Sequence, residues 1–358
     1  MDKIINNTCE IVIDKSYEGI KNYIGNNGKI SKYDKILTIT DENVKEHQLY
    51  DFKRDTKLKN LCTFVIKAGE ESKDMDVYTE IMEFCIKNGL MRKSLIIALG
   101  GGVVGDLAGF VASTYMRGID VIQIPTTLLA QVDSSIGGKT GINIGNYKNV
   151  IGSFHQPRLT YINTNALKTL EENEFISAMS EVIKYGVIYD YEFLKYLNKY
   201  SEQIINREQE HIYEIVKRSA TIKAEIVDKD EKEGGLRKIL NFGHTFGHGV
   251  EKLMSINHGS AVSIGMNMAF KLALSENMID KTYYDEFIEV CQKYSLMTEI
   301  PTKEENIENT ILDIMKKDKK NSFDKISLIL PTNKGEVVVT DNITNEKILK
   351  VIKETKHA

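Results

Sequence analysis

The chain has 358 residues, of which 42% are hydrophobic and 27% are charged. These are ordinary values for a globular protein, so the chain can bury a large core in one or two domains, and a small disulfide-stapled scaffold is excluded. Its 47 basic and 51 acidic residues give a net charge of -4, without the basic excess of a nucleic-acid-binding protein. We therefore expect no nucleic acid partner and no membrane partner.

The cysteines and the first residues indicate the compartment. Cys9, Cys62, Cys85 and Cys291 are scattered without a C-x-x-C pair, which favours free thiols in a reducing environment. The first 14 residues lack the apolar core of a signal peptide, and no run reaches the roughly 18 apolar residues of a membrane span. A cytoplasmic protein is the expectation.

Residues 1–160 alternate short β-rich runs with polar or helical stretches. The runs are CEIVID at 9–14, KILTITDENV at 35–44, CTFVIKAGEESKD at 62–74, SLIIALGGG at 94–102 and VIQIPTT at 121–127. This alternation predicts a parallel α/β sheet, so we expect a Rossmann-like nucleotide-binding domain over residues 1–160. In such a sheet, ligands bind at the carboxyl ends of the strands.

Residues 161–358 have a different character. Apolar residues recur at helical spacing with few breakers over 173–188, 189–227 and 260–277. Near the C-terminus, ISLILP and EVVVTD are typical of a short hairpin. The sequence therefore predicts a mainly α-helical second domain over residues 161–358.

A glycine-rich segment follows the most apolar strand. Gly100, Gly102 and Gly105 satisfy G-x-G-x-x-G before an expected helix, a pattern that lets backbone N–H groups approach a pyrophosphate. A turn of this kind also occurs for packing reasons alone. The acidic residue that would bind a ribose is either Asp120 or Asp41 by position.

A second glycine pair, residues 137–138, directly precedes Lys139. The sequence G-G-K-T suggests a P-loop, but Asp133 stands where the first glycine of that motif would be. A nucleotide triphosphatase is therefore disfavoured. Lys139 is either a phosphate ligand held by the glycine turn or a solvated loop lysine.

Glu181 and Lys184 lie three positions apart in SEVIKYG, on one face of an expected helix. Taken alone, such a pair is usually a surface ion pair. Further along, Arg237 and Asn241 lie four apart, and Lys223 precedes them. These side chains would supply donors for a polyanionic substrate if the chain folds back, and are otherwise ordinary surface residues.

Three of the seven histidines, His244, His248 and His258, fall within fifteen residues. Two or three imidazoles with one carboxylate make a plausible catalytic zinc site, and the alternative is a group of histidines without metal. A zincin protease is excluded, because the second position of H-T-F-G-H is threonine rather than glutamate. The spacing does not decide which two histidines bind.

Several segments together closely resemble the 3-dehydroquinate synthase family of the sugar-phosphate cyclases. They are GGGVVGDLAGFVASTYMRG, IPTTLLAQVDSSIGGKTGIN, LKTL, EVIKYG, EGGLRKILNFGHTFGH and HGSAVSIGM. They occur in that family's order, and the resemblance covers about residues 69–320. Joint occurrence makes the signal specific, although each motif alone is weak.

The resemblance implies a set of ligand-binding residues. It implies that NAD is held by Asp41, Glu70, Lys73, Gly102, Val103, Val104, Gly105, Asp106, Thr126, Thr127, Asp133, Lys139, Lys148, Thr169 and Glu174. It implies that zinc, or another divalent cation such as cobalt, is bound by Glu181, His244 and His258. We accept this set over a chelate of His244 and His248, because glycines at 243, 247 and 249 are expected to interrupt a helix through both.

The remaining implied residues handle the substrate, a small-molecule sugar phosphate. They are Arg117, Lys139, Lys184, Lys223, Arg237, Asn241 and His248, with Lys319 or Lys320 expected to close on the phosphate end. The implied enzyme is a lyase of the shikimate pathway, acting as a homodimer. It would convert 3-deoxy-D-arabino-heptulosonate 7-phosphate to 3-dehydroquinate and phosphate.

The implied reaction combines transient oxidation by NAD, phosphate elimination, reduction and an intramolecular aldol closure. Two alternatives retain part of this chemistry. One is another NAD- and metal-dependent sugar-phosphate cyclase, and the other is a metal-dependent polyol dehydrogenase. A non-catalytic NAD-binding regulator is disfavoured, since its lysines and histidines would have no chemical role.

Overall fold

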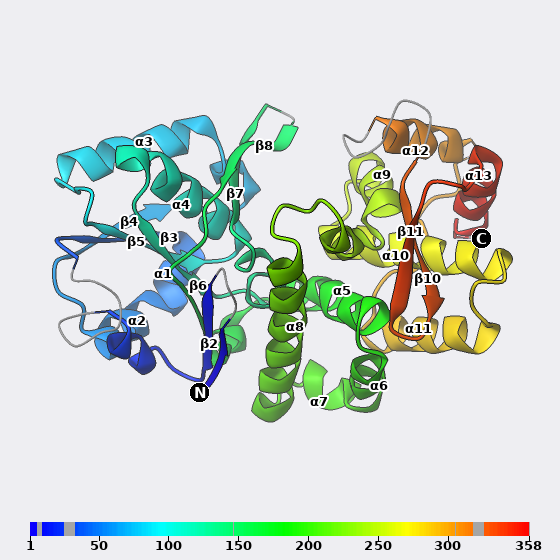
Figure 1. Cartoon of the computed structure of the whole chain (residues 1–358), viewed down its shortest axis with the longest axis horizontal. Coiled ribbons are helices and arrows are strands. Elements are labelled where there is room, and N and C mark those ends of the chain that lie inside the picture. Colours follow the sequence, from blue (N-terminus) through cyan, green and yellow to red (C-terminus); the bar gives the residue numbers. More distant parts are fainter. Residues whose placement is uncertain (6–8, 25–32, 146, 305, 318–325, 358) are drawn as a thin grey trace. The chain divides into compact units, whose positions relative to one another are not determined.

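The computed structural model describes residues 1–5, 9–24, 33–145, 147–304, 306–317 and 326–357 (Figure 1). The chain divides into two compact units. The first comprises Met1–Glu171 and Ile212–Asp228, and the second comprises Glu172–His211 and Lys229–Ala358. Residues 161–171 and 212–228 thus lie in the first unit, although the sequence placed them in the second domain.

The first unit is built on a sheet whose order is β1-β2-β9-β6-β5-β3-β4. All neighbouring pairs in it are parallel except β1 with β2. The strands are β1 (Asp2–Ile5), β2 (Glu10–Asp14), β3 (Ile36–Asp41), β4 (Leu61–Ile66), β5 (Leu95–Gly100), β6 (Asp120–Pro125) and β9 (Leu159–Asn163). The prediction of a largely parallel α/β sheet is confirmed. Because β9 pairs with both β2 and β6, the chain cannot leave this unit at residue 160.

The core of the first unit lies on both faces of the sheet. Every residue of β5 is buried, as expected for a central parallel strand. Successive side chains of β5 point to opposite faces of the sheet and join different hydrophobic clusters. Ile96 packs with α3 (Met75–Lys87) and α4 (Gly102–Thr114). Ile97 packs with Phe52 of α2 (Leu49–Thr56). Helix α1 (Glu42–His47) follows β3 directly. Covering both faces leaves the strand ends as the places for ligands.

The β7–β8 hairpin, and the place of helix α8 in the first unit, were not predicted from the sequence. Strands β7 (Lys139–Ile144) and β8 (Tyr147–Phe154) form an antiparallel hairpin outside the main sheet. Helix α8 (Gln209–Lys229) returns to this unit for most of its length. There, Tyr213 Oη donates a hydrogen bond of 3.0 Å to the carbonyl oxygen of Ile13 in β2.

The second unit is mainly helical, as predicted. Its helices are α5 (Glu172–Ile188), α6 (Tyr191–Lys199), α7 (Ser201–Ile205), α9 (His244–Met254), α10 (His258–Ser275), α11 (Lys281–Lys293), α12 (Ile307–Lys316) and α13 (Asn345–Glu354). Strands β10 (Leu328–Asn333) and β11 (Glu336–Thr340) form the predicted terminal hairpin. The stretch 189–227 is divided among α6, α7 and α8 rather than forming one helix.

Helix α10 is the centre of the second unit, since residues 261–270 are all buried. It packs on α5, α9, α11, α13 and β10. Its contact with α9 is close: a Cβ on Gly265 would lie 2.0 Å from the carbonyl oxygen of Gly243, and one on Gly247 would lie 2.8 Å from that of Ala261. These glycines let the backbones approach, so the first turn of α9 lies against residues 261–265 of α10.

No helix in the described ranges combines the length and the apolar character needed to cross a membrane.

Candidate active site

In the first unit, neighbouring parallel strands end together at one edge of the sheet. Asp41 of β3 pairs with Ile66 of β4, and Gly100 of β5 pairs with Pro125 of β6. The segments that follow these ends share that edge, where α/β sheets bind ligands. They hold many of the expected nucleotide contacts: Glu70, Lys73, Gly102 to Asp106, Thr126 and Thr127.

The turn between β5 and α4 has the predicted strand–turn–helix form. A Cβ on Gly101 would lie 2.9 Å from Thr127 Cγ2, and one on Gly105 would lie 2.9 Å from Gln123 Oε1. Thr126 is buried, and its hydroxyl has no hydrogen-bond partner among the described residues. A tight glycine turn at a helix N-terminus, with an unpaired hydroxyl beside it, suits a phosphate-bearing cofactor.

Of the two candidate ribose ligands, Asp41 lies at this edge and Asp120 does not. Asp120 begins β6 at the opposite edge, where its carboxylate accepts hydrogen bonds from Tyr33 Oη at 3.0 Å and Arg158 Nε at 2.8 Å. Asp41 ends β3 and caps α1, accepting a hydrogen bond of 2.9 Å from the N–H of Val44. Burial raises the pKa of the Asp41 carboxyl, against the effect of that backbone contact.

Lys73 connects three segments near this edge. Its buried Nζ donates to Asp106 Oδ2 in α4 and to Asn149 Oδ1 in β8, both at 2.5 Å. Nearby, Asn143 Nδ2 of β7 donates to Glu70 Oε1 at 2.8 Å. Burial raises the pKa of Asp106, opposed by the charge of Lys73. Neither asparagine was predicted as a site residue, because no sequence pattern indicated the β7–β8 hairpin that carries them.

The structure also brings Asp133 and Lys223 together. Lys223 lies on α8, and its Nζ donates to the carbonyl oxygen of Asp133 at 2.6 Å and to Asp133 Oδ1 at 2.7 Å. Lys139 follows Gly137 and Gly138, both at positive φ, and its side chain is exposed at the start of β7. The turn expected before this lysine is therefore present.

Three other expected residues of the first unit have different settings. Lys148 is exposed on β8, and Thr169 accepts a hydrogen bond of 2.8 Å from Gln48 Nε2. Arg117 is exposed just after the C-terminal end of α4, three residues before β6 begins. That is the amino edge of the sheet, so the first unit does not bring Arg117 to the expected nucleotide contacts.

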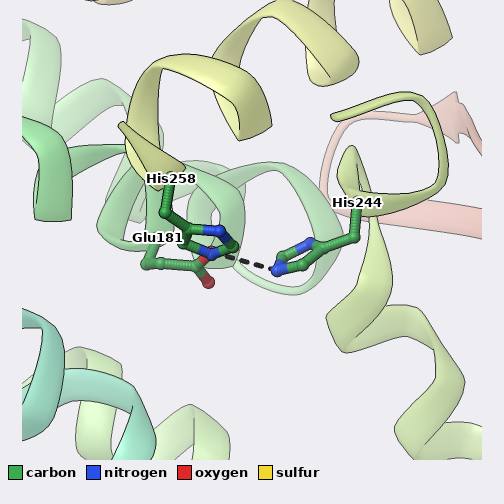
Figure 2. Close-up of side chains that lie close together, drawn as sticks. All are labelled: Glu181, His244 and His258. Carbon is green, nitrogen blue, oxygen red and sulfur yellow. Dashed lines mark ion pairs between the residues drawn. The ribbon is translucent and has the colours of Figure 1, made fainter. Parts of the chain in front are cut away.

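In the second unit, Glu181, His244 and His258 converge from three helices (Figure 2). Glu181 comes from α5, His244 begins α9 and His258 begins α10. Glu181 Oε1 lies 3.3 Å from His244 Nε2 and 3.7 Å from His258 Nε2, and one ligand atom from each residue lies within 4.8 Å of the others. Oε1 is buried without a hydrogen-bond partner in the described structure. One carboxylate and two imidazoles arranged in this way fit a divalent cation such as Zn²⁺.

Both imidazoles turn the same nitrogen toward the carboxylate. His244 Nδ1 donates to the carbonyl oxygen of Phe242 at 3.1 Å, and His258 Nδ1 donates to Glu251 Oε2 at 3.2 Å. With Nδ1 occupied, each ring is left with Nε2 as its metal-binding atom. Histidines that merely fill a core have no need of this common orientation.

Glu181 and Lys184 are a buried pair, not the surface pair that the spacing alone suggests. Lys184 Nζ donates to Glu181 Oε2, and both side chains are 2% exposed. Burial alone would raise the pKa of Glu181, but Lys184, His244 and His258 hold it well below its usual value. Burial lowers the pKa of His244 to about 3, so this imidazole is neutral and able to bind a metal at neutral pH.

Other expected residues of the second unit lie around or apart from this cluster. The ring of His248 lies 5.6 Å from that of His244, but His248 is not among the converging ligands. Glu174 is exposed in the first turn of α5. Lys319 and Lys320 lie outside the described residues.

The segment before α9 holds Arg237 and Asn241 in the 3-10 helix η6 (Leu236–Asn241). Arg237 is buried, and its Nη1 donates to the carbonyl oxygen of Glu231. Asn241 Nδ2 donates to Glu233 Oε1 at 2.6 Å. Glu233 was not predicted as a site residue, because it lies in a turn before η6 whose sequence has no regular period.

One expectation about this region is wrong. Glycines at 243, 247 and 249 do not interrupt the helix, since α9 begins at His244 and continues through His248 to Met254. Gly243, at φ +79, precedes the helix, while Gly247 lies against α10 and Gly249 against Ile311. Packing therefore offsets the low helix propensity of glycine.

Comparison with known proteins decides the family. The model of the 3-dehydroquinate synthase N-terminal domain matches residues 63–177, and that of the C-terminal domain matches residues 178–321. A 3-dehydroquinate synthase of Thermoanaerobacter sp. (strain X514) is 46% identical over 327 residues, which cover 89% of this chain and 90% of that protein. One of Alkaliphilus metalliredigens is 47% identical over 307 residues, 85% of each. The chain belongs to the 3-dehydroquinate synthase family.

A solved structure of 2-deoxy-scyllo-inosose synthase, complexed with carbaglucose-6-phosphate, NAD+ and Co2+, shares the fold of this 3-dehydroquinate synthase family member. Its TM-score is 0.86 at 24% identity, over 99% of both chains. The resemblance inferred from the sequence motifs is thus confirmed at the level of family and fold.

Proposed function

We propose that this chain is a 3-dehydroquinate synthase, a carbon–oxygen lyase of the shikimate pathway. It converts 3-deoxy-D-arabino-heptulosonate 7-phosphate to 3-dehydroquinate and inorganic phosphate. The observation that carries the proposal is the convergence of Glu181, His244 and His258 in a chain that is 46% identical to a 3-dehydroquinate synthase across 89% of its length.

The two cofactors have different places in the chain. NAD would bind at the carboxyl edge of the sheet in the first unit, where the glycine turn before α4 and the buried Lys73 lie. The metal, zinc or cobalt, would bind to Glu181, His244 and His258. Bound NAD would accept a hydride and return it within one turnover, and the cation would make a substrate hydroxyl more acidic. Because the hydride returns, the overall reaction has no net oxidation.

The remaining polar residues would bind and orient the anionic substrate. Lys184 is buried beside the carboxylate of the metal site, where an ammonium would stabilise negative charge on a departing phosphate. Lys139, Lys223, Arg237, Asn241 and His248 would supply further donors. Holding the two reactive ends of the ring-opened intermediate, formed after phosphate loss, within one site would favour the intramolecular closure.

The proposal includes a cytoplasmic homodimer. None of the four cysteines, all within the described ranges, forms a disulfide, which fits a reducing compartment. Light scattering of the purified protein on a size-exclusion column should give twice the chain mass. A monomer mass would contradict the dimer without affecting the proposed reaction.

The reaction is tested by incubating the purified chain with the heptulosonate phosphate, NAD and zinc while following inorganic phosphate and the NADH absorbance together. We expect phosphate to be released in proportion to 3-dehydroquinate, with no NADH accumulation, and a chelator to stop turnover. NADH without phosphate would indicate a polyol dehydrogenase. Phosphate released only from another sugar phosphate would indicate a different cyclase.

A further inference from the structure

Glu251 lies behind the His258 imidazole, on the side away from Glu181. It is on α9, seven residues after His244, so the two side chains share one face of the helix two turns apart. Glu251 Oε2 lies 3.2 Å from His258 Nδ1, whereas His258 Nε2 lies 3.7 Å from Glu181 Oε1. The two nitrogens of one ring thus contact two different carboxylates.

The backbone of His258 is fixed independently of this contact. Asn257 caps α10, its Oδ1 accepting a hydrogen bond of 2.8 Å from the N–H of Ser260, and the N–H of Gly259 donates to Ser177 Oγ of α5 at 3.1 Å. These contacts place the Cα of His258 but leave the rotation of its ring open, because the χ2 torsion of histidine is broad and roughly two-fold.

The partner of His244 differs in kind. The Nδ1 of His244 donates to a backbone carbonyl, that of Phe242, whose side chain is fully buried. The orientation of the His244 ring is therefore set by the fold itself. The orientation of the His258 ring instead depends on the side chain of Glu251, which is 19% exposed. A substitution of Glu251 can therefore remove this contact.

We propose that Glu251 is a positioning residue that holds the Nδ1–H of His258 and so aims Nε2 at the metal. The inference rests on the metal site of the proposed function. A carboxylate behind a ligand imidazole fixes its tautomer and orientation and makes the metal-binding nitrogen more basic. Glu251 is not itself a ligand, because it contacts the nitrogen on the far side of the ring from the converging atoms.

The test measures the Co²⁺ affinity of the full-length chain by chelator competition, from about pH 7 to about pH 9.5. At the high end of this range protons no longer compete with the metal for His258, so any remaining loss of affinity reports on the missing Glu251 contact. In the Glu251→Ala variant we expect affinity at high pH to fall about 10- to 100-fold and the visible Co²⁺ spectrum to change. Glu251→Gln, which can still accept the Nδ1–H bond, should lose less. Lys252→Ala, an exposed neighbour on the same helix, should match the unaltered chain.

Thermal unfolding of the metal-free variants separates positioning from structural support. A Glu251→Ala variant with a lowered melting temperature but unchanged Co²⁺ affinity and spectrum would overturn the proposal. If His258→Ala also binds Co²⁺ like the unaltered chain, the metal site itself fails, and with it the proposed function. If only His258→Ala loses the metal, the site stands and the role of Glu251 is rejected.

Discussion

At the level of single residues, the burial of Lys184 beside Glu181 distinguishes it from the other described lysines of the helical unit. Lys195 on α6 forms an ion pair with Glu192 at the same spacing, but that pair is more than half exposed. Exposed pairs contribute little, whereas a buried ammonium acts in a low dielectric. The identical sequence pattern therefore occurs in two different environments, and only burial distinguishes them.

The first prediction concerns the Lys184→Ala variant. We expect the rate of phosphate release to fall by about 10²–10³-fold, as when one charge-stabilising donor is removed from an active site. NAD affinity should change little, since nearly all expected NAD contacts lie in the other unit. Single-turnover phosphate release and NAD titration measure the two effects, with Lys195→Ala as the control. Equal losses in both would reject the assigned role.

A second prediction at this scale is the pH dependence of metal binding. Burial alone would lower the pKa of His258, but Glu181 and Glu251 raise it to about 9 in the metal-free protein. Below that pH a metal must displace one proton from His258, while His244, with a pKa of about 3, is already neutral. Affinity should therefore rise with pH by about one log unit per unit up to roughly pH 9, then level off.

Calorimetry in buffers of different ionisation enthalpy measures this proton release. We expect about one proton per metal at neutral pH and fewer above pH 9. Release of two protons at neutral pH would show that both imidazoles are protonated in the metal-free protein, against the effect of burial on His244.

At the level of elements, the helices and strands whose apolar residues recur at a regular spacing could be predicted from the sequence. The buried strand β5, the glycine turn and α4 could be inferred from local pattern, as could α5 and the terminal hairpin. Helix α9 could not, because its glycines have low helix propensity and their compensation comes from packing against other helices, among them α10. Glu251 was missed for the same reason: its relation to His244 exists only if α9 is a helix.

The close contact of α9 and α10 gives a third prediction. A Cβ on Gly265 would meet the carbonyl oxygen of Gly243 at 2.0 Å, so Gly265→Ala must push the helices apart. We expect a loss of roughly 1–3 kcal/mol in the free energy of unfolding, together with weaker Co²⁺ binding because His244 begins α9. Denaturant unfolding and the Co²⁺ titration measure these effects.

The control for Gly265→Ala is Gly234→Ala. A Cβ there would have its nearest contact at 3.9 Å, with Asp230 Oδ1, and Gly234 is exposed. This variant should unfold like the unaltered chain. If both variants lose the same stability, the helix contact is not the cause.

At the level of the whole molecule, the two units are not consecutive in sequence, and this could not be read from composition. The helical spacing of 212–228 resembles that of the neighbouring helices, yet this segment belongs to the α/β unit. Its place is decided by contacts with residues that are far away in the sequence. These contacts join Tyr213 to the Ile13 carbonyl, Lys217 to Asp2 at 3.0 Å, and Lys223 to Asp133. Local sequence patterns contain no information about such partners.

The fourth prediction follows from this interleaving. A fragment of residues 1–171 lacks α8, so Asp133 loses its buried ammonium partner and β2 loses the Tyr213 contact. Joining residues 212–228 to it through a long glycine–serine linker restores these partners, and we expect a higher melting temperature and tighter NAD binding than for residues 1–171 alone. Circular dichroism melting and NAD titration measure both. In the linked fragment, Lys223→Ala should remove part of the gain, because the partly buried carboxylate of Asp133 then loses this ammonium partner. Identical behaviour of the fragments with and without α8 would mean that the α/β unit is complete at residue 171 and that α8 only rests on it.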